Sequence, residues 1–474
     1  MIPWDKLHEE CGVFGIGIHD GPSESAAPYV HLGLYALQHR GQESAGIATF
    51  DGERVHLVKD MGLVANIFTP ERLSALSGRT GIGHVRYSTM GGARLENAQP
   101  FLEPTPWGTL AVAHNGNLVN APLLRAELEG AGCRFHATSD TEVICKLIAT
   151  APASTLEEAV AFCMGRIIGA YTVVALVGDR LLAFRDAHGI RPLAMGRLSG
   201  ATVFASESCA FDQTGAETVR EVGAGELLIA DASGLQAIQV LPRARRASCV
   251  FEYIYFARPD SILEHQNVHQ VRRRMGRVLA RLHPAEADIV IAVPDSGASA
   301  AMGFAEASGI ALEVGLIKNR YIGRTFIQPD PSQRDFGVRV KLNPVQDIIA
   351  GRRVVLVDDS IVRGTTSRQI VRMLRHAGAH EVHVRVSSPP ITNACFYGID
   401  TSNRGELIAA RLSVEEIRQE IEADSLGYLD VAGLVEALGL PRNELCLACL
   451  TGAYPTETPT ETLAGRFALE SRRT

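Results

Sequence analysis

Apolar positions in the second half of the chain form short uninterrupted runs, each followed by a small polar loop. Residues 354–357 are apolar and mostly β-branched, which is typical of a strand buried on both faces of a sheet. After a polar loop, residues 367–378 have helical spacing, and Gly378 stands where a helix ends. Residues 288–293 repeat the strand pattern. This alternation predicts a parallel, doubly wound sheet.

The first half of the chain is richer in strands. Strand patterns are found at residues 11–18, 83–89, 110–118, 170–177 and 181–185, and again near Val203. Helical patterns are predicted at residues 29–39, from about 120 and from 139. Ser139 and Glu142 have the spacing of a capping box, and Asp51-Gly52 predicts a hairpin turn. Together these elements predict a mixed α+β domain of about 230 residues.

The patterns also divide the chain into parts. At 474 residues it is too long for one ordinary domain. We expect a leading polar segment, two domains and a loose tail, at residues 1–10, 11–240, 241–452 and 453–474. Near the end of the second domain, residues 412–421 and 428–438 are predicted to be helical.

The composition is that of a soluble globular protein. Hydrophobic residues make up 46% and charged residues 21% of the chain. A net charge of −7 over this length indicates no nucleic-acid partner, and no apolar run is long enough to span a membrane. Nine irregularly spaced cysteines and no secretory segment predict a reducing, cytoplasmic location without a disulfide framework.

The loop after residues 354–357 has the chemistry of a phosphate site. Asp358 and Asp359 follow the strand, and a Ser/Arg/Gly/Thr segment leads into the helix. Loop N–H groups at the positive end of the helix, with the Thr365 and Thr366 hydroxyls, can hold a phosphate dianion. The two carboxylates would repel phosphate, so they predict sugar hydroxyls, Mg²⁺ or both as partners. The alternative is an acidic turn in some other doubly wound sheet.

This segment resembles the 5-phosphoribosyl 1-pyrophosphate (PRPP) motif of the phosphoribosyltransferases. The resemblance implies that Asp358 and Asp359 bind the ribose hydroxyls and help to place Mg²⁺. It implies that the 5-phosphate is bound by the loop residues Ser360, Ile361, Val362, Arg363, Gly364, Thr365 and Thr366. It also places Ser296, in the loop after residues 288–293, near the metal ion.

A polar stretch from residue 318 to 344 precedes the PRPP motif. Its Pro, Gly and Gln content and its lack of periodicity predict a mobile segment. By the same resemblance the segment closes over PRPP, and Arg339 and Lys341 bind pyrophosphate. A solvated basic loop is the alternative.

Four pieces of the first half together resemble the glutaminase domain of the N-terminal-nucleophile amidotransferases. They are residues 11–12, 37–41, 84–89, and 114–118 with the later 139–140. The resemblance implies that Cys11 attacks glutamine, with its own α-amine as base once residues 1–10 are removed as a propeptide. The other implied roles are the Asn115 amide and Gly116 N–H for the oxyanion, and Arg86, Asp140 and Arg40 for binding glutamine.

Each of these positions also has an ordinary structural explanation. Cys11 can be a small buried residue of a strand, and Asp140 can cap its helix. Asn115-Gly116 can be a hairpin turn. Any one of these interpretations is as acceptable as the functional one, but the occurrence of all the pieces in one chain and in this order favours function.

Two cysteines near the end of the second domain, Cys446 and Cys449, form a C-x-x-C pair, which suggests half a metal site or a redox pair. With Cys249 and Cys395 they match, by resemblance, the four thiolate ligands of a [4Fe–4S] cluster. A Cys₄ zinc site is the rival, because ligand types alone do not separate the two. The cysteines interpreted as core residues are Cys133, Cys145, Cys163 and Cys209.

From Cys11 to Gly452 the motifs follow the order of the glutamine PRPP amidotransferases, in their propeptide-bearing, iron–sulfur form. The resemblance implies an Ntn-hydrolase-type domain of layered sheets flanked by helices, then an α/β type I phosphoribosyltransferase domain. It implies that ammonia from glutamine reaches C1 of PRPP, giving 5-phosphoribosylamine, glutamate and pyrophosphate, the first committed step of purine biosynthesis. The expected cofactors and partners are one Mg²⁺ per subunit, a [4Fe–4S] cluster, inhibitory purine nucleotides and further copies in a homotetramer.

Two other functions share part of the pattern. A glutamine amidotransferase that makes glucosamine 6-phosphate or asparagine would share the first domain but lack residues 358–366. A non-enzymatic PRPP-sensing regulator would need the second domain alone and would have no use for Cys11, Arg86 and Asp140 together.

Overall fold

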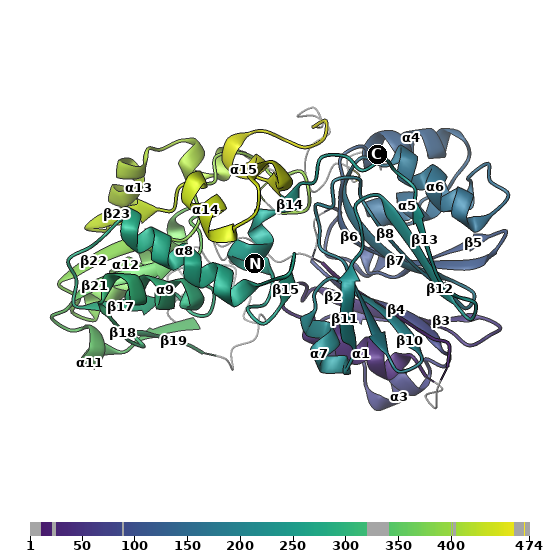
Figure 1. Cartoon of the computed structure of the whole chain (residues 1–474), viewed down its shortest axis with the longest axis horizontal. Helices are drawn as coiled ribbons and strands as arrows, with labels where there is room; N and C mark the ends of the chain where they lie inside the picture. Colours follow the sequence, from purple (N-terminus) through teal and green to yellow (C-terminus); the bar gives the residue numbers. More distant parts are fainter. Residues whose placement is uncertain are drawn as a thin grey trace.

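The computed structural model describes residues 11–20, 25–87, 90–319, 341–399, 401, 404–458 and 469. Two domains lie side by side, the first drawn in purple to teal and the second in green to yellow (Figure 1). The predictions for residues 1–10, for Arg339 with the rest of 320–340, and for most of the tail lie outside the described residues.

The first domain is built on two antiparallel sheets. One contains β1 (Gly12–Ile18), β2 (Ser44–Phe50), β3 (Val55–Met61), β4 (Thr80–Arg86), β9 (Ala194–Leu198), β10 (Ala201–Ala205) and β11 (Glu217–Glu221). The other contains β5 (Phe101–Thr105), β6 (Gly108–Leu118), β7 (Gly169–Val177), β8 (Arg180–Arg185), β12 (Glu226–Asp231) and β13 (Gly234–Gln239). Within the described ranges the strand orders are β11-β9-β10-β1-β4-β2-β3 and β13-β12-β8-β7-β6-β5.

Helices cover the outer faces of both sheets. They are α1 (Ala27–Ala36), α2 (Val64–Ile67), α3 (Pro70–Ser74), η1 (Leu95–Asn97), α4 (Ala121–Gly130), α5 (Asp140–Ala149), α6 (Leu156–Arg166) and α7 (Cys209–Thr214). Phe14 of β1 packs with Leu34 of α1, whereas its neighbour Val13 packs with Val174 of the other sheet. Successive β1 side chains thus enter two different cores. The result is a helix–sheet–sheet–helix arrangement, which confirms the predicted layered domain.

Local predictions in this domain have mixed outcomes. The hairpin at Asp51-Gly52 is confirmed, because it joins β2 to β3. The predicted capping box is wrong. Ser139 caps α5 by accepting from the Thr141 N–H at 3.3 Å, but Glu142 accepts from the N–H groups of the preceding loop, at residues 136 and 137. Its carboxylate therefore orders the loop instead of the helix end.

The second domain contains a parallel sheet with helices on both sides. Its main strands are β17 (Ile289–Ala292), β18 (Ala311–Leu312), β21 (Arg353–Asp358), β22 (Glu381–Val386) and β23 (Ser425–Tyr428). Its helices are α8 (Val268–Leu282), α9 (Ala298–Ser308), α11 (Gln346–Ile349), α12 (Thr365–His376), η4 (Arg404–Glu406), η5 (Ile408–Ala410), α13 (Val414–Glu420), α14 (Val431–Leu438), η6 (Arg442–Glu444) and α15 (Ala448–Thr451). In the described part of the chain the order is β18-β17-β21-β22-β23, with every pairing parallel. The predicted doubly wound sheet is confirmed.

The helices predicted near the end of this domain are partly wrong. Residues 412–421 do contain α13. Within 428–438, however, the first residue belongs to β23, and α14 begins only after Asp430, whose Oδ1 accepts from the Gly433 N–H at 2.6 Å. The edge strand has only four residues, too few to show a period of its own.

Short pairings complete the second domain. They are β14 (Ser248–Cys249) with β24 (Leu445–Cys446), β15 (Ile262–Leu263) with β16 (Gln266–Asn267), and β19 (Leu316–Lys318) with β20 (Leu342–Pro344). The first of these is parallel and joins the two ends of the domain. A π-helical turn, η2 (Glu252–Phe256), follows β14 at the border with the first domain. No helix of the described residues is long and apolar enough to cross a membrane.

Candidate active sites

Cys11 lies immediately before β1 and is buried. Its Sγ donates to the carbonyl oxygen of Tyr87 at 3.3 Å. Burial raises the pKa of the Cys11 thiol to about 11, and the nearby Arg86 guanidinium opposes this rise only in part. Such a thiol is protonated at neutral pH, so nucleophilic chemistry at this position needs a base.

Three charges act on the Cys11 thiol: the Arg86 guanidinium lowers its pKa, and the Asp140 and Glu43 carboxylates raise it. Arg86 ends β4 and its Nη2 donates to the Met90 carbonyl at 3.0 Å. Asp140 begins α5, and its Oδ2 accepts from the Leu118 N–H at 3.0 Å. The helix cap is Ser139, so the interpretation of Asp140 as the cap is wrong. A cation and an anion beside one thiol suit the two charged ends of an amino acid.

Asn115 and Gly116 lie inside β6 and pair with β7, so the hairpin-turn alternative is wrong. The Asn115 Nδ2 is buried and makes no hydrogen bond with any described residue. Gly116 has φ +144°, and a Cβ there would lie 2.0 Å from the Ala170 carbonyl oxygen. A buried amide without a partner needs an explanation, and a developing oxyanion would provide one.

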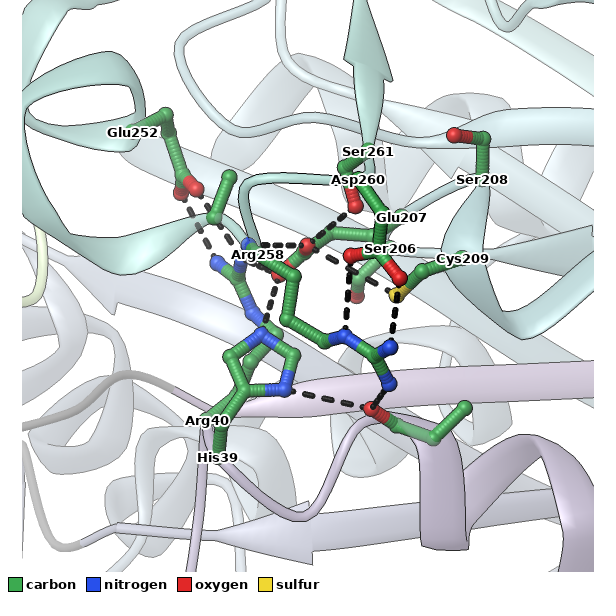
Figure 2. A network of polar contacts seen from close by, with 12 residues as sticks. His39, Arg40, Ser206, Glu207, Ser208, Cys209, Glu252, Arg258, Asp260 and Ser261 are labelled. Carbon is green, nitrogen blue, oxygen red and sulfur yellow. Dashed lines mark hydrogen bonds and ion pairs between the residues drawn. The ribbon is translucent and has the colours of Figure 1, made fainter. Parts of the chain in front are cut away.

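Arg40 has a more complex environment than the sequence suggested. Its Nε donates to the Cys11 carbonyl oxygen at 3.0 Å, and its other nitrogens donate to Glu207 and Glu252 (Figure 2). That Arg40 lines the glutamine pocket stays a prediction. Sequence reasoning missed both carboxylates. Glu252 did carry a signal, because it is the one charged residue within the apolar run 250–257 and therefore needs a buried partner.

The acid pair of the second domain stands at the carboxyl end of its central strand. Asp358 ends β21, and its Oδ1 accepts from the Asp359 N–H at 2.9 Å. The Ser360 hydroxyl donates to Asp359 Oδ2 at 2.6 Å. Both carboxylates are buried, which places them at the position where open α/β sheets bind their ligands.

The loop from the acid pair into α12 has the predicted shape. Gly364 is the N-cap with φ +85°, and a Cβ there would lie 2.7 Å from Ile408. Thr365 and Thr366 begin the helix, so their N–H groups and hydroxyls lie at its positive end. Between the acid pair and the cap, Ile361 is buried in the core, and Arg363 pairs with Glu406.

Of the remaining predicted PRPP and metal residues, Ser296 and Lys341 are among the described residues. Ser296 is in the loop between β17 and α9, next to Gly297, where a Cβ would lie 2.4 Å from the Val357 carbonyl oxygen. This loop therefore packs against the end of β21. Lys341 directly precedes β20, and its carbonyl accepts from the Asn319 N–H at 2.8 Å. Lys341 is thus the first described residue after 320–340.

The four cysteines predicted to bind one cluster lie in one hydrophobic core, and they are Cys249, Cys395, Cys446 and Cys449. Cys249 and Cys446 face each other in the β14–β24 register, and Cys449 is in α15. Burial, together with the nearby Cys395, Cys446 and Cys249, raises the pKa of the Cys449 thiol. Across the described ranges, however, no three His, Cys, Asp or Glu side chains are arranged to hold a metal ion. Four thiols are suitable ligands for a [4Fe–4S] cluster, but it stays a prediction that these four cysteines bind one.

Comparison with known proteins decides the family. Residues 84–213 match the model of a glutamine amidotransferase domain. The chain is 50% identical to the amidophosphoribosyltransferase of Synechocystis sp., over 98% of this chain and 95% of that protein. The Bacillus subtilis amidophosphoribosyltransferase is also 50% identical, over 96% of each chain. This chain belongs to the amidophosphoribosyltransferase family. Amidophosphoribosyltransferases are pentosyltransferases that carry a glutamine amidotransferase domain.

Solved amidophosphoribosyltransferase structures have the same fold over nearly the whole chain. A Bacillus subtilis glutamine PRPP amidotransferase complexed with ADP and GMP has a TM-score of 0.89 at 50% identity, covering 94% of this chain and 98% of that one. A structure described as the allosteric regulatory enzyme of purine biosynthesis has a TM-score of 0.92 at 49% identity, covering 97% and 99%. Because the likeness spans both domains, the two rival functions are excluded.

Proposed function

We propose that this amidophosphoribosyltransferase hydrolyses glutamine at Cys11 and passes the ammonia to C1 of PRPP, forming 5-phosphoribosylamine, glutamate and pyrophosphate. One observation carries the proposal. A single chain holds both a thiol flanked by Arg86 and Asp140 and an acid pair with a phosphate loop at the end of β21. The reaction is the first committed step of purine biosynthesis.

The glutamine half-reaction follows from the residues around Cys11. Arg86 would bind the α-carboxylate and Asp140 the α-ammonium, which aims the side-chain amide at the thiol. The Cys11 sulfur bonds to the amide carbon and ammonia leaves. Water then cleaves the thioester to release glutamate. The Asn115 Nδ2, buried and without a partner among the described residues, and the Gly116 N–H would stabilise the oxyanion.

Removal of residues 1–10 is part of the proposal, because it supplies the missing base. While Cys11 is joined to residue 10 it has no free α-amine, and its pKa of about 11 keeps the thiol protonated. A terminal α-amine has a pKa near ~8 and adjoins the thiol, so it can accept the proton at neutral pH. The ammonia would travel inside the protein, because in water it would be protonated and lost.

At the second site, ammonia displaces pyrophosphate from C1 of PRPP. Asp358 and Asp359 would bind the ribose hydroxyls, residues 360–366 the 5-phosphate, and Arg339 and Lys341 the pyrophosphate. A Mg²⁺ ion held with Ser296, Asp358 and Asp359, one per subunit, would neutralise charge on the departing pyrophosphate.

The four buried cysteines would bind a [4Fe–4S] cluster. Its role would be structural, because Cys249 and Cys446 lie on the two strands that join the ends of the domain. A zinc ion is the other occupant compatible with four thiolates. Iron and sulfide analysis of anaerobically purified protein distinguishes the two.

Regulation and assembly complete the proposal. We propose a cytoplasmic homotetramer inhibited by purine nucleotides. The related Bacillus subtilis structure with ADP and GMP supports nucleotide binding.

The deciding experiment measures glutamate and pyrophosphate release by anaerobically purified protein supplied with glutamine and Mg²⁺, with and without PRPP. Matched release of both products, dependent on PRPP, is expected. Glutamate release that ignores PRPP would mean a different acceptor. If neither product forms, the intact mass will show whether Cys11 ever became the N-terminus.

A further inference from the structure

A buried group of charges that spans both domains holds the backbone of Cys11. Arg40 lies at its centre, with Nε donating to the Cys11 carbonyl oxygen at 3.0 Å. The other edge of its guanidinium faces Glu207, which follows β10 of the first domain, and Glu252, which begins η2 of the second (Figure 2). Arg40, Glu207 and Glu252 are all buried.

Glu252 contacts Arg40 at two points. Its Oε1 accepts from Nη2 at 2.8 Å and its Oε2 from Nη1 at 2.9 Å. Such bidentate pairing fixes the plane of a guanidinium as well as its position. Arg191 adds a second cation, with Nη1 3.4 Å from Oε1. Burial would raise the pKa of Glu252, but the two arginines hold it below its usual value, so the carboxylate is ionised at neutral pH.

Glu207 completes the surroundings of Arg40 from the first domain. Its Oε1 accepts from Arg40 Nη1 and from His39 Nε2, and its Oε2 accepts from the Ser261 hydroxyl at 2.6 Å and the Arg258 N–H at 2.8 Å (Figure 2). The segment from Glu252 to Ser261 therefore contacts the first domain through two carboxylates. Glu252 of the second domain binds Arg40, and Glu207 of the first domain accepts from Arg258 and Ser261.

The same segment is anchored inside the second domain by Arg272 of α8. Arg272 Nε donates to the Tyr253 carbonyl at 2.7 Å, and its Nη2 donates to the Ala257 carbonyl at 2.8 Å. The side chain is buried, and the charge of Asp359, from the PRPP loop, acts on it. Glu252 is thus held by the body of the PRPP-binding domain, not by a surface loop.

The bond from Arg40 to the Cys11 carbonyl matters most once Cys11 is the first residue. A terminal residue keeps one peptide bond and frays unless something holds it. Gly12 is the first residue paired in β1, with Val85 opposite. The Arg40 bond therefore restrains the peptide between Cys11 and Gly12, and with it the direction of the thiol and the α-amine.

We infer that Glu252 is a positioning residue of the glutamine site, although it belongs to the PRPP-binding domain. It holds Arg40 in the plane in which Nε fixes the Cys11 carbonyl. This inference rests on the proposed function, in which Cys11 is the N-terminal nucleophile. Glu252 acts through Arg40 and does not touch glutamine.

The test substitutes Glu252→Gln, which keeps the size of the side chain and removes its charge. Glutamine-dependent kcat is expected to fall about 10- to 100-fold, because small displacements of a reacting group cost this much. The KM for glutamine changes less than kcat, because Arg86 and Asp140, which would bind the two charged ends of glutamine, are untouched. The ammonia-dependent rate stays within about twofold, which shows that the second domain is folded. Glu306→Gln is the matched control, since Glu306 is an exposed partner of Arg277 in the same domain.

A double-mutant cycle with Arg40→Lys separates positioning from general support of the fold. Lysine keeps the positive charge between the two carboxylates but cannot make the planar contact. If Glu252 acts through Arg40, Glu252→Gln adds less than about twofold to the loss already caused by Arg40→Lys. Additive losses, an unchanged glutamine-dependent kcat in Glu252→Gln, or an equal loss of the glutamine and ammonia activities would overturn the inference.

Failure of the proposed function would look different. In that case the unsubstituted protein itself would show no PRPP-dependent release of glutamate. The wild-type protein is therefore measured first, and the variants are interpreted against its ratio of glutamine- to ammonia-dependent rates.

Discussion

The two active sites are built from the chain in opposite ways. The proposed glutamine site gathers Cys11, Arg86, Asn115 and Asp140 from separate strands and one helix, over about 130 residues. The proposed PRPP site has its core in one continuous segment, residues 358–366, from the end of β21 to the first turn of α12. The shape of a site made of one segment is determined by its local strand–loop–helix structure. A site made of many segments depends on the sheets that bring them together.

The largest effect is expected from removing the nucleophile of the assembled site. Cys11→Ala should lower glutamine-dependent synthesis at least about 10³-fold, because no other group forms the thioester. Synthesis with added ammonia should remain, since the PRPP site is intact. Both rates are measured by pyrophosphate release. Loss of the ammonia rate in a folded variant would contradict the separation of the two sites.

The next effect concerns pH. In a chain that keeps residues 1–10, the pKa of about 11 leaves roughly 10⁻³ of Cys11 as thiolate at pH 8. Alkylation of Cys11, followed by peptide mass spectrometry, should therefore rise about tenfold per pH unit until pH nears 11. In the processed chain it should level off at lower pH, because the α-amine takes the proton.

The same pKa shift makes the stability of the fold depend on pH, and stability should fall as the pH rises. The pKa of the Cys11 thiol is raised on folding from about 9 to about 11. The neutral thiol therefore stabilises the fold fully below pH 9, and this contribution is lost as the pH rises through 11.

For the alkylation experiment, a plateau near pH 8 in the chain that keeps residues 1–10 would contradict the buried environment assigned to the Cys11 thiol.

At the continuous site, Asp359→Asn removes one buried carboxylate and leaves the backbone in place. Glutamine- and ammonia-dependent synthesis should fall together, by about 10²- to 10³-fold, because in the proposed function both need PRPP and Mg²⁺ bound at this loop. Asp347→Asn, at an exposed position of α11, is the control. A loss confined to the glutamine reaction would assign Asp359 to the other site.

A smaller effect is expected at a backbone position of the assembled site. Gly116→Ala puts a Cβ 2.0 Å from the Ala170 carbonyl, at φ +144°. Glutamine-dependent kcat should fall about 100-fold as the proposed oxyanion donors move, and the free energy of unfolding should fall by about 1–3 kcal/mol. Gly165→Ala in α6 is the control, because nothing lies within 4 Å of its Cβ. The control should be stabilised by roughly 0.5–1 kcal/mol, and an equal response of both glycines would contradict the argument.

The same contrast explains what the sequence could predict. Residues 354–378 were assigned as strand, loop and helix from local signals alone, and the structure confirms them as β21, a short loop and α12. Six strands of the first domain and the turn between β2 and β3 were also found locally. Strands β5, β9, β11, β12 and β13 were missed, and so was the order of the strands in two facing sheets. The resemblance to known families supplied Cys11, Arg86, Asn115 and Asp140 as one site.

The parts that could not be predicted depend on contacts between distant residues. Glu207 and Glu252 lie 45 positions apart in the sequence, and they meet only because β10 and η2 converge on Arg40. The partner of Glu142 was misassigned because the helix cap and the preceding loop compete for one carboxylate. Strand β23 was missed because four edge residues carry no pattern of their own.

The parallel pairing of Ser248 with Leu445 also sets an order in time. These strands are separated by about 200 residues, so the first cannot find its partner until nearly the whole chain has been synthesised. At about 5–20 residues per second the ribosome needs roughly 10–40 s to cover this distance. The first domain has that interval to fold alone, and a chain that stops short of Leu445 cannot form this pairing.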